Sequence, residues 1–150
     1  MADEFLETTV DKFVFRVRRE CWYSDSGVWV HLDDGSARVG VGDYLQQISG
    51  DVAFVDVRPV GTVLGRGEEL ASIETIKVIL SVESPVAGTI IQVNEALEGS
   101  PELVNQDPYG EGWLAVIELR DWETDRAGLL DAERYLEAMR AQAQEEVTRK

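Results

Sequence analysis

The chain has 150 residues, which is enough for one domain with a single hydrophobic core. Its net charge of −15 argues against binding to nucleic acid or to an anionic membrane, because both need basic patches. One cysteine and one histidine leave almost no material for a disulfide, a zinc site or Cys-His catalysis, so we expect a non-enzyme. No segment has the pattern of a signal peptide or a membrane-spanning helix, and we expect a cytoplasmic monomer.

Most of the chain is predicted to form short strands separated by turns. Residues 1–22 are expected to form an N-terminal extension with an edge strand, and residues 33–36 (Asp-Asp-Gly-Ser) a hairpin turn. The predicted strands are residues 13–17, 28–32, 37–40, 52–57, 89–93 and 113–119. The residues expected to form one core are Val52, Phe54, Val86, Ile90, Trp113 and Ile117.

Three helices are predicted. The first spans residues 43–50, with Asp43 as its cap, Tyr44, Leu45 and Ile48 as its apolar face, and Gly50 as its end. A second short helix begins at Ser100-Pro101 and ends before Pro108. The third starts near Leu130, and residues 141–150 are expected to fray as a polar tail. Its apolar residues at helical spacing are Ala132, Leu136, Met139 and Ala143.

A faint internal repeat relates residues 61–64 to residues 88–91. In both copies a Gly-Thr pair and two apolar residues are followed by a glutamate and a leucine at the same offsets. One interpretation is a small β sandwich of two related halves, with the hairpin between them displaying Lys77. The alternative is a chance match between segments rich in β formers.

Lys77 is the feature that most needs an explanation. It is the only lysine between Lys12 and Lys150, and residues 67–119 contain ten carboxylates but no other basic residue. Unlike arginine, lysine can lose its proton, and its amine can then be acylated. Three interpretations stay open: a buried strand residue that needs a partner, an ordinary surface lysine, or a lysine displayed at a hairpin tip for covalent modification.

The segments around Lys77 resemble a known signature. Residues 72–78 (Ser-Ile-Glu-Thr-Ile-Lys-Val) and 84–88 (Ser-Pro-Val-Ala-Gly) are similar to the E-S-V-K-A…S-P-V-S-G pattern of the glycine cleavage H-protein family. The segment Asn-Gln-Asp-Pro-Tyr-Gly-Glu-Gly-Trp at residues 105–113 is highly specific for that family. The resemblance covers roughly residues 23–139. Further matching segments are residues 41–44, 50–55, 93–97, 100–104 and 129–133.

The resemblance implies a mainly β fold, a β sandwich of the lipoyl/biotinyl type (a barrel-sandwich hybrid) with short flanking helices and a C-terminal helix. It implies lipoic acid in amide linkage on Lys77, at a site that also includes the neighbouring residues Glu74, Thr75, Ile76 and Val78. Residues 23–140 would then be the carrier domain. The partners implied are a lipoate-attaching enzyme and a dihydrolipoamide dehydrogenase. The arm would swing between the active sites of partner enzymes, so that the carrier supplies chemistry without being a catalyst.

Two departures from the family bear on the pathway. Gly27 and Val28 stand where H proteins normally have histidine and glutamate, which puts handling of an aminomethyl-loaded arm in doubt. The hairpin continues from Lys77 with the apolar residues 78–80, where the family has small or polar ones. These features resemble the H-protein-like lipoate-binding proteins of bacterial sulfur oxidation, which serve a heterodisulfide-reductase-like complex, and we expect that branch. The alternatives are a glycine cleavage H protein, which shuttles the aminomethyl group to the glycine cleavage proteins, and a non-lipoylated adaptor of the same fold.

Overall fold

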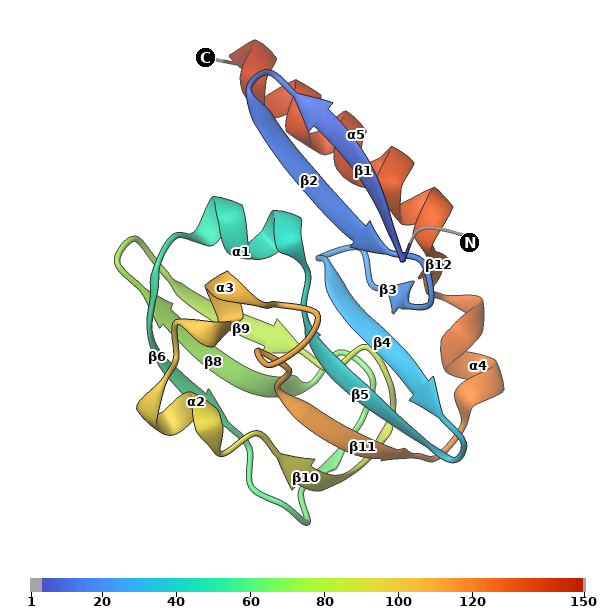
Figure 1. Cartoon of the computed structure of the whole chain (residues 1–150). Coiled ribbons are helices and arrows are strands. Elements are labelled where there is room, and N and C mark those ends of the chain that lie inside the picture. The colour runs from blue at the N-terminus through green and yellow to red at the C-terminus, as the bar shows by residue number, and fades with distance from the viewer. Residues whose placement is uncertain (1–3, 150) are drawn as a thin grey trace.

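A computed structural model describes residues 4–149, and these form antiparallel sheets with five helices around them (Figure 1). One sheet has seven strands in the order β12-β3-β4-β5-β11-β10-β7, a second has three in the order β6-β8-β9, and β1 and β2 form a hairpin of their own. The strands are β1 (Phe5–Val10), β2 (Phe13–Arg18), β3 (Trp22–Tyr23), β4 (Val28–Asp33), β5 (Ser36–Val41), β6 (Val52–Val57), β7 (Val63–Leu64), β8 (Glu69–Thr75), β9 (Ile79–Glu83), β10 (Gly88–Val93), β11 (Ala115–Leu119) and β12 (Leu130–Asp131). The helices are α1 (Asp43–Ser49), α2 (Ala96–Gly99), α3 (Leu103–Gln106), α4 (Trp122–Ala127) and α5 (Ala132–Arg149).

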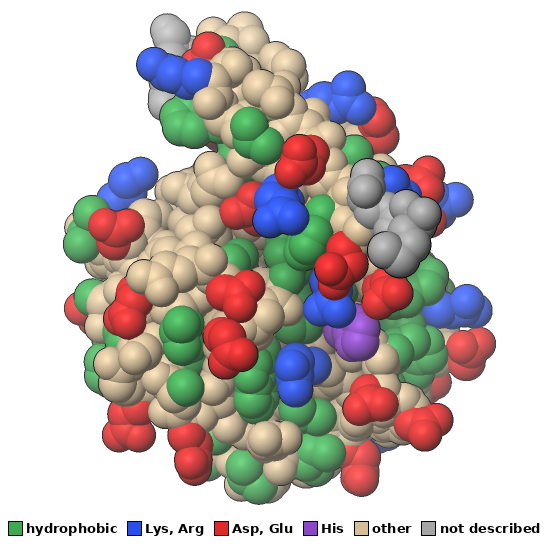
Figure 2. Space-filling model, in the orientation of Figure 1, with side chains coloured by type: hydrophobic (Ala, Val, Ile, Leu, Met, Phe, Trp, Pro, Cys, Tyr) green, Lys and Arg blue, Asp and Glu red, His purple; other side chains and the backbone are tan. Residues whose placement is uncertain are grey.

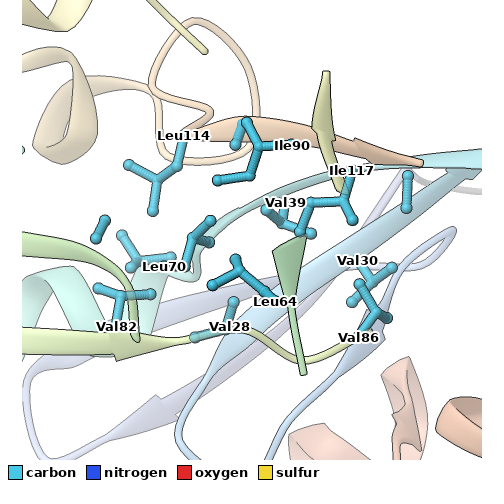
Figure 3. Close-up of a cluster of buried hydrophobic side chains, with 14 of the residues drawn as sticks. Val28, Val30, Val39, Leu64, Leu70, Val82, Val86, Ile90, Leu114 and Ile117 are labelled. Atoms are coloured by element: carbon cyan, nitrogen blue, oxygen red, sulfur yellow. The ribbon is translucent and has the colours of Figure 1, made fainter. Parts of the chain in front are cut away.

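The main core lies between the seven-stranded and the three-stranded sheet (Figure 3). Side chains alternate along each strand, so that one set points into the sandwich and the other set points out. Val39, Ile90 and Ile117 enter from the larger sheet, and Leu70 and Val82 enter from the smaller one. The predicted β sandwich with flanking helices is therefore confirmed.

A second core joins the two ends of the chain. The β1–β2 hairpin packs along α5, and together they form a lobe that extends from the sandwich (Figure 1). Tyr23 of β3 stacks on Tyr135 of α5 with ring centroids 4.3 Å apart. Trp29 is fully buried, and its ring lies 6.1 Å from that of Tyr109. Aromatic side chains thus fasten the lobe to the sandwich.

The helix predictions need three corrections. Gly42, and not Asp43, is the N-cap of α1, and the Asp43 carboxylate instead accepts a hydrogen bond from the backbone N–H of Arg16 at 2.9 Å. Helices α2 and α4 were not predicted. The tail expected to fray from residue 141 continues α5 to Arg149, because Ala143 is buried in the contact between α5 and the first hairpin.

Two predicted core residues are wrong. The ladder between β6 and β8 has an irregularity between Val52 and Phe54, after which Val55 and Val57 face the core while Phe54 is 60% exposed. Trp113 precedes β11, and it is Leu114 that is fully buried in the sandwich. The indole of Trp113 is partly buried against the second core instead, with the Arg38 guanidinium 4.8 Å from its ring.

The two copies of the internal repeat lie in one sheet. Strand β7 pairs with β10, and Val63 is opposite Thr89. They are therefore neighbours and do not belong to separate halves of the sandwich. Over residues 4–149, none of the helices combines the length and the hydropathy that crossing a membrane requires.

Candidate functional site

Lys77 lies in a tight turn between β8 and β9, at the end of the three-stranded sheet that is nearest to α1 (Figure 1). The backbone N–H of Thr75 donates to the carbonyl oxygen of Val78 at 2.9 Å, which closes a four-residue turn with Ile76 and Lys77 at its centre. The buried Thr75 hydroxyl accepts hydrogen bonds from the backbone N–H groups of Lys77 (3.1 Å) and Val78 (3.0 Å). One side chain therefore holds the third and fourth residues of the turn.

The turn is also tied to the loop between α1 and β6. The Thr75 hydroxyl donates to the carbonyl oxygen of Ser49 at 2.7 Å, and the N–H of Ile76 donates to that of Asp51 at 3.1 Å. Asn105 of α3 holds this loop from the other side. Its side chain donates to the carbonyl oxygen of Gly50 at 3.1 Å and accepts from the N–H of Val52 at 2.8 Å. Asn105, the first residue of the family-specific segment at residues 105–113, thus supports the lysine turn indirectly, through this loop.

The Lys77 side chain is exposed and makes no ion pair with any of the described residues. Its aliphatic part lies over Gly50, where an added Cβ would come within 3.3 Å of Lys77 Cδ. Gly50 has a φ of 94°, a conformation that favours glycine. Gly50 is therefore suited both to its own backbone and to the close approach of the lysine stem.

Apolar side chains surround the lysine. Ile76 and Ile79 are each 74% exposed, and Val78 is also exposed. Leu80 instead packs against the main core, so the apolar run after Lys77 divides between surface and core. Glu74, the remaining predicted site residue, is exposed at the end of β8. An exposed amine on a hydrogen-bonded turn, with no ion-pair partner among residues 4–149, meets the requirements of a lysine that another enzyme acylates.

A groove of about 530 Å³ begins at Lys77 and runs between α1 and the lobe. Figure 2 shows the surface hollowed between the sandwich and the lobe of β1, β2 and α5. Tyr44 and Ile48 of α1 line one wall, and Phe13 and Val147 belong to the other. No pattern in the sequence pointed to this groove, because the two walls come from distant parts of the chain.

Gly27 and Val28 do not belong to an open site. Gly27 has a φ of 94°, and an added Cβ there would come within 2.9 Å of the Tyr135 hydroxyl oxygen. Val28 is 1% exposed and lies in the main core. A histidine at residue 27 would clash with the Tyr135 hydroxyl, and a glutamate at residue 28 would place a charge in the core without a partner. The departure from the family pattern is therefore coupled to Tyr135 on α5.

Cys21 is a packing residue. It is 3% exposed within the second core, and burial raises the pKa of its thiol to about 12. The thiolate is the reactive form of cysteine, and a pKa in this range leaves almost none of it at neutral pH.

Replacing Thr75 by valine is expected to loosen the turn without unfolding the sandwich. Valine keeps the shape of threonine but leaves the N–H groups of Lys77 and Val78 without their acceptor, at a cost of about 1–3 kcal/mol. Amide hydrogen exchange at these two residues should become faster. Thr62→Val is the matched control, since that hydroxyl makes one bond in an exposed turn. Unchanged exchange at Lys77 and Val78 would mean that the hydroxyl does not hold the turn.

Comparison with known proteins points to one family. The family described as "Glycine cleavage H-protein" matches residues 21–142. The glycine cleavage system H protein of Thermus thermophilus is 42% identical over 127 residues, which cover 85% of this chain and 98% of that protein. The one from Aeromonas hydrophila is 47% identical over 117 residues, covering 77% of this chain and 90% of that protein. The crystal structure of the H protein from Mycobacterium marinum has a TM-score of 0.74 and 28% identity, covering 81% of this chain and 97% of that one.

These proteins bear the name of the glycine cleavage system, and none of the three is named for sulfur oxidation. The expected placement in the sulfur-oxidation branch is therefore not supported, and the glycine cleavage alternative fits the comparisons better.

Proposed function

Because the chain belongs to the glycine cleavage H-protein family, we propose that it is the lipoyl carrier of a glycine cleavage system, with the lipoyl group attached to Lys77. Members of this family are non-catalytic and bind lipoic acid covalently on a lysine. The observation that carries the assignment of the residue is the turn itself, in which Lys77 is exposed while Thr75 and Gly50 fix its position.

Each part of the turn has a task in this function. The exposed amine of Lys77 is accessible to a lipoate-attaching enzyme. The lipoyl group, when bound, supplies a disulfide that is reduced to a dithiol as it takes up its cargo and is reoxidised by a dihydrolipoamide dehydrogenase. Thr75 and the loop at residues 49–52 hold the base of the arm in place, so that only the arm moves between partners.

The apolar surface around the lysine suits docking of partner proteins. Ile76, Val78 and Ile79 expose apolar area beside the modified residue, and the acidic chain as a whole favours basic partners. The partners that follow from this proposal are the lipoate-attaching enzyme and the other glycine cleavage proteins. Residues 23–140 form the carrier domain in this proposal, and residues 1–22 are an extension to it.

Mass spectrometry of peptides tests the attachment site. Protein produced in cells able to lipoylate it should carry the adduct on Lys77, and Lys77→Arg should remove it while leaving the circular dichroism spectrum unchanged. Lys12→Arg is the matched control, because Lys12 is also an exposed lysine at a hairpin turn, and it should leave the adduct in place. An adduct that persists in Lys77→Arg, or none on the wild-type protein, would refute the proposal.

A further inference from the structure

Two segments that lie outside the match to the family complete the surface around Lys77. The β1–β2 hairpin precedes residue 21, and the last turns of α5 follow residue 142. Phe13 of the hairpin and Val147 of α5 line the same groove as Lys77. Family membership therefore assigns no role to these two segments.

Exposed apolar side chains gather at this end of the molecule. Of the eleven large apolar side chains that are exposed among residues 4–149, six either lie within two residues of Lys77 or line the groove with it. These six are Phe13, Ile48, Ile76, Val78, Ile79 and Val147. Apolar surface concentrated in this way is characteristic of a site of protein interaction.

The hairpin is held in place beside the lysine turn by α1. The Asp43 carboxylate accepts a hydrogen bond from the N–H of Arg16, and the Gln47 side chain donates to the carbonyl oxygen of Val14 at 3.0 Å. At the other end of α1, the carbonyl oxygen of Ser49 accepts from the Thr75 hydroxyl. One helix thus fixes the hairpin and the lysine turn relative to each other, and both can be contacted by the same partner.

The turn alone is too small to be recognised by a partner protein. Specific interfaces bury roughly 800 Å² on each partner, which is more than four residues supply. An enzyme that takes Lys77 into its active site must also cover surface beside the turn, where Phe13 and Val147 are 50% and 39% exposed. A second copy of this chain is a poor occupant, because both copies would carry a net charge of −15.

We infer that the N-terminal hairpin and the end of α5 form a recognition surface for the enzyme that attaches lipoate to Lys77, and that this enzyme meets them with an apolar surface of its own. The inference rests on the proposed lipoylation of Lys77. In that reaction the Lys77 amine loses its proton to water and forms an amide bond with the carboxyl carbon of lipoyl adenylate, which is made from lipoate and ATP, and AMP leaves. The hairpin takes no part in this step and contributes only affinity for the enzyme.

Steady-state kinetics of lipoylation test the inference. The unmodified chain is incubated with a lipoate–protein ligase, lipoate and ATP, and the mass increase of the intact protein gives the rate. The double variant Phe13→Ser plus Val147→Ser should raise the KM for the carrier about tenfold, equivalent to about 1.4 kcal/mol, and leave kcat unchanged, since it removes binding and not chemistry. Phe13→Leu should keep KM within about twofold of the wild type, because leucine retains an apolar side chain.

Val63→Ser is the matched control, since Val63 is 62% exposed but lies in the seven-stranded sheet, away from the lysine turn. It should keep the wild-type KM. A double variant with the wild-type KM overturns the inference, as does a fall in kcat alone or an equal rise of KM in Val63→Ser. If the double variant loses its folded circular dichroism spectrum, Phe13→Ser alone decides by the same criteria.

Two further outcomes separate this inference from the proposed function. Normal lipoylation of the double variant, followed by a slower reaction with glycine decarboxylase, would assign the surface to a different partner and overturn the inference alone. Absence of an adduct on Lys77 of the wild-type protein refutes the proposed function, and this inference with it.

Discussion

Replacing Trp29 by alanine is expected to lower the free energy of unfolding by about 3–5 kcal/mol, the range for removing a buried tryptophan. The Trp29 side chain is 0% exposed and lies between the sandwich and the lobe. Its indole N–H donates to the carbonyl oxygens of Val41 and Pro108, each at 3.0 Å. Gly40 is adapted to the ring, since an added Cβ there would come within 2.7 Å of it. Loss of the ring therefore removes packing and leaves two carbonyl groups without their donor.

Urea unfolding followed by far-ultraviolet circular dichroism measures this effect without relying on tryptophan fluorescence. Trp29→Phe should retain most of the apolar contact and cost less than the alanine variant, because only the indole hydrogen bonds and part of the ring are lost. Trp113→Ala should also cost less than Trp29→Ala, since Trp113 is only partly buried. A larger loss for Trp113 than for Trp29 would contradict the arrangement of the two cores.

The lysine site could be predicted from the sequence because its signals are local. Lys77 stands out in an acidic stretch, and the residues around it form a recognisable pattern. The support of the turn could not be predicted in the same way. Thr75 is fixed by the carbonyl oxygen of Ser49, and the loop that follows Ser49 is held in turn by Asn105, which lies in a different helix. Such contacts depend on tertiary structure, and no spacing within one segment encodes them.

Errors in the predicted core have the same origin. Strict alternation places Phe54 inside, but the irregularity after Val52 reverses the faces of β6. Composition made residues 141–149 look like a polar tail, but packing of Ala143 against the hairpin keeps them helical. One register shift was enough to change the assignment of Phe54, and one buried contact was enough to change that of the C-terminal segment.

Gly27 and Val28 illustrate a different difficulty. As isolated differences from the family pattern they suggested a change of pathway. The structure shows instead that the Tyr135 hydroxyl lies where a side chain at residue 27 would begin, and that Val28 is part of the core. A residue on α5, more than a hundred positions away, thus accounts for a difference near the N-terminus. The pathway has to be decided by a functional assay.

The assay with the largest expected effect is the glycine-dependent exchange of carboxyl carbon with bicarbonate, catalysed by glycine decarboxylase. The lipoylated chain should support exchange at a rate within about tenfold of a standard H protein, which is a difference of less than about 1.4 kcal/mol in transition-state free energy. Lys77→Arg should reduce exchange to the background without carrier, because no other residue offers the arm. Lys12→Arg, prepared with the same degree of lipoylation, should keep the full rate.

Reduction of the arm by NADH, catalysed by dihydrolipoamide dehydrogenase in the reverse of its usual direction and run on the same samples, separates a defect in the pathway from a defect in the arm. Both reactions need an accessible lipoyl group, but only exchange needs the aminomethyl group to be accepted. Normal reduction with normal exchange supports a glycine cleavage carrier, in which the Gly27–Tyr135 contact replaces the usual residues without loss of function. Normal reduction with exchange at the background rate would mean that the arm is intact but cannot take up the aminomethyl group. That outcome would exclude glycine cleavage and assign the carrier to another lipoyl-dependent pathway.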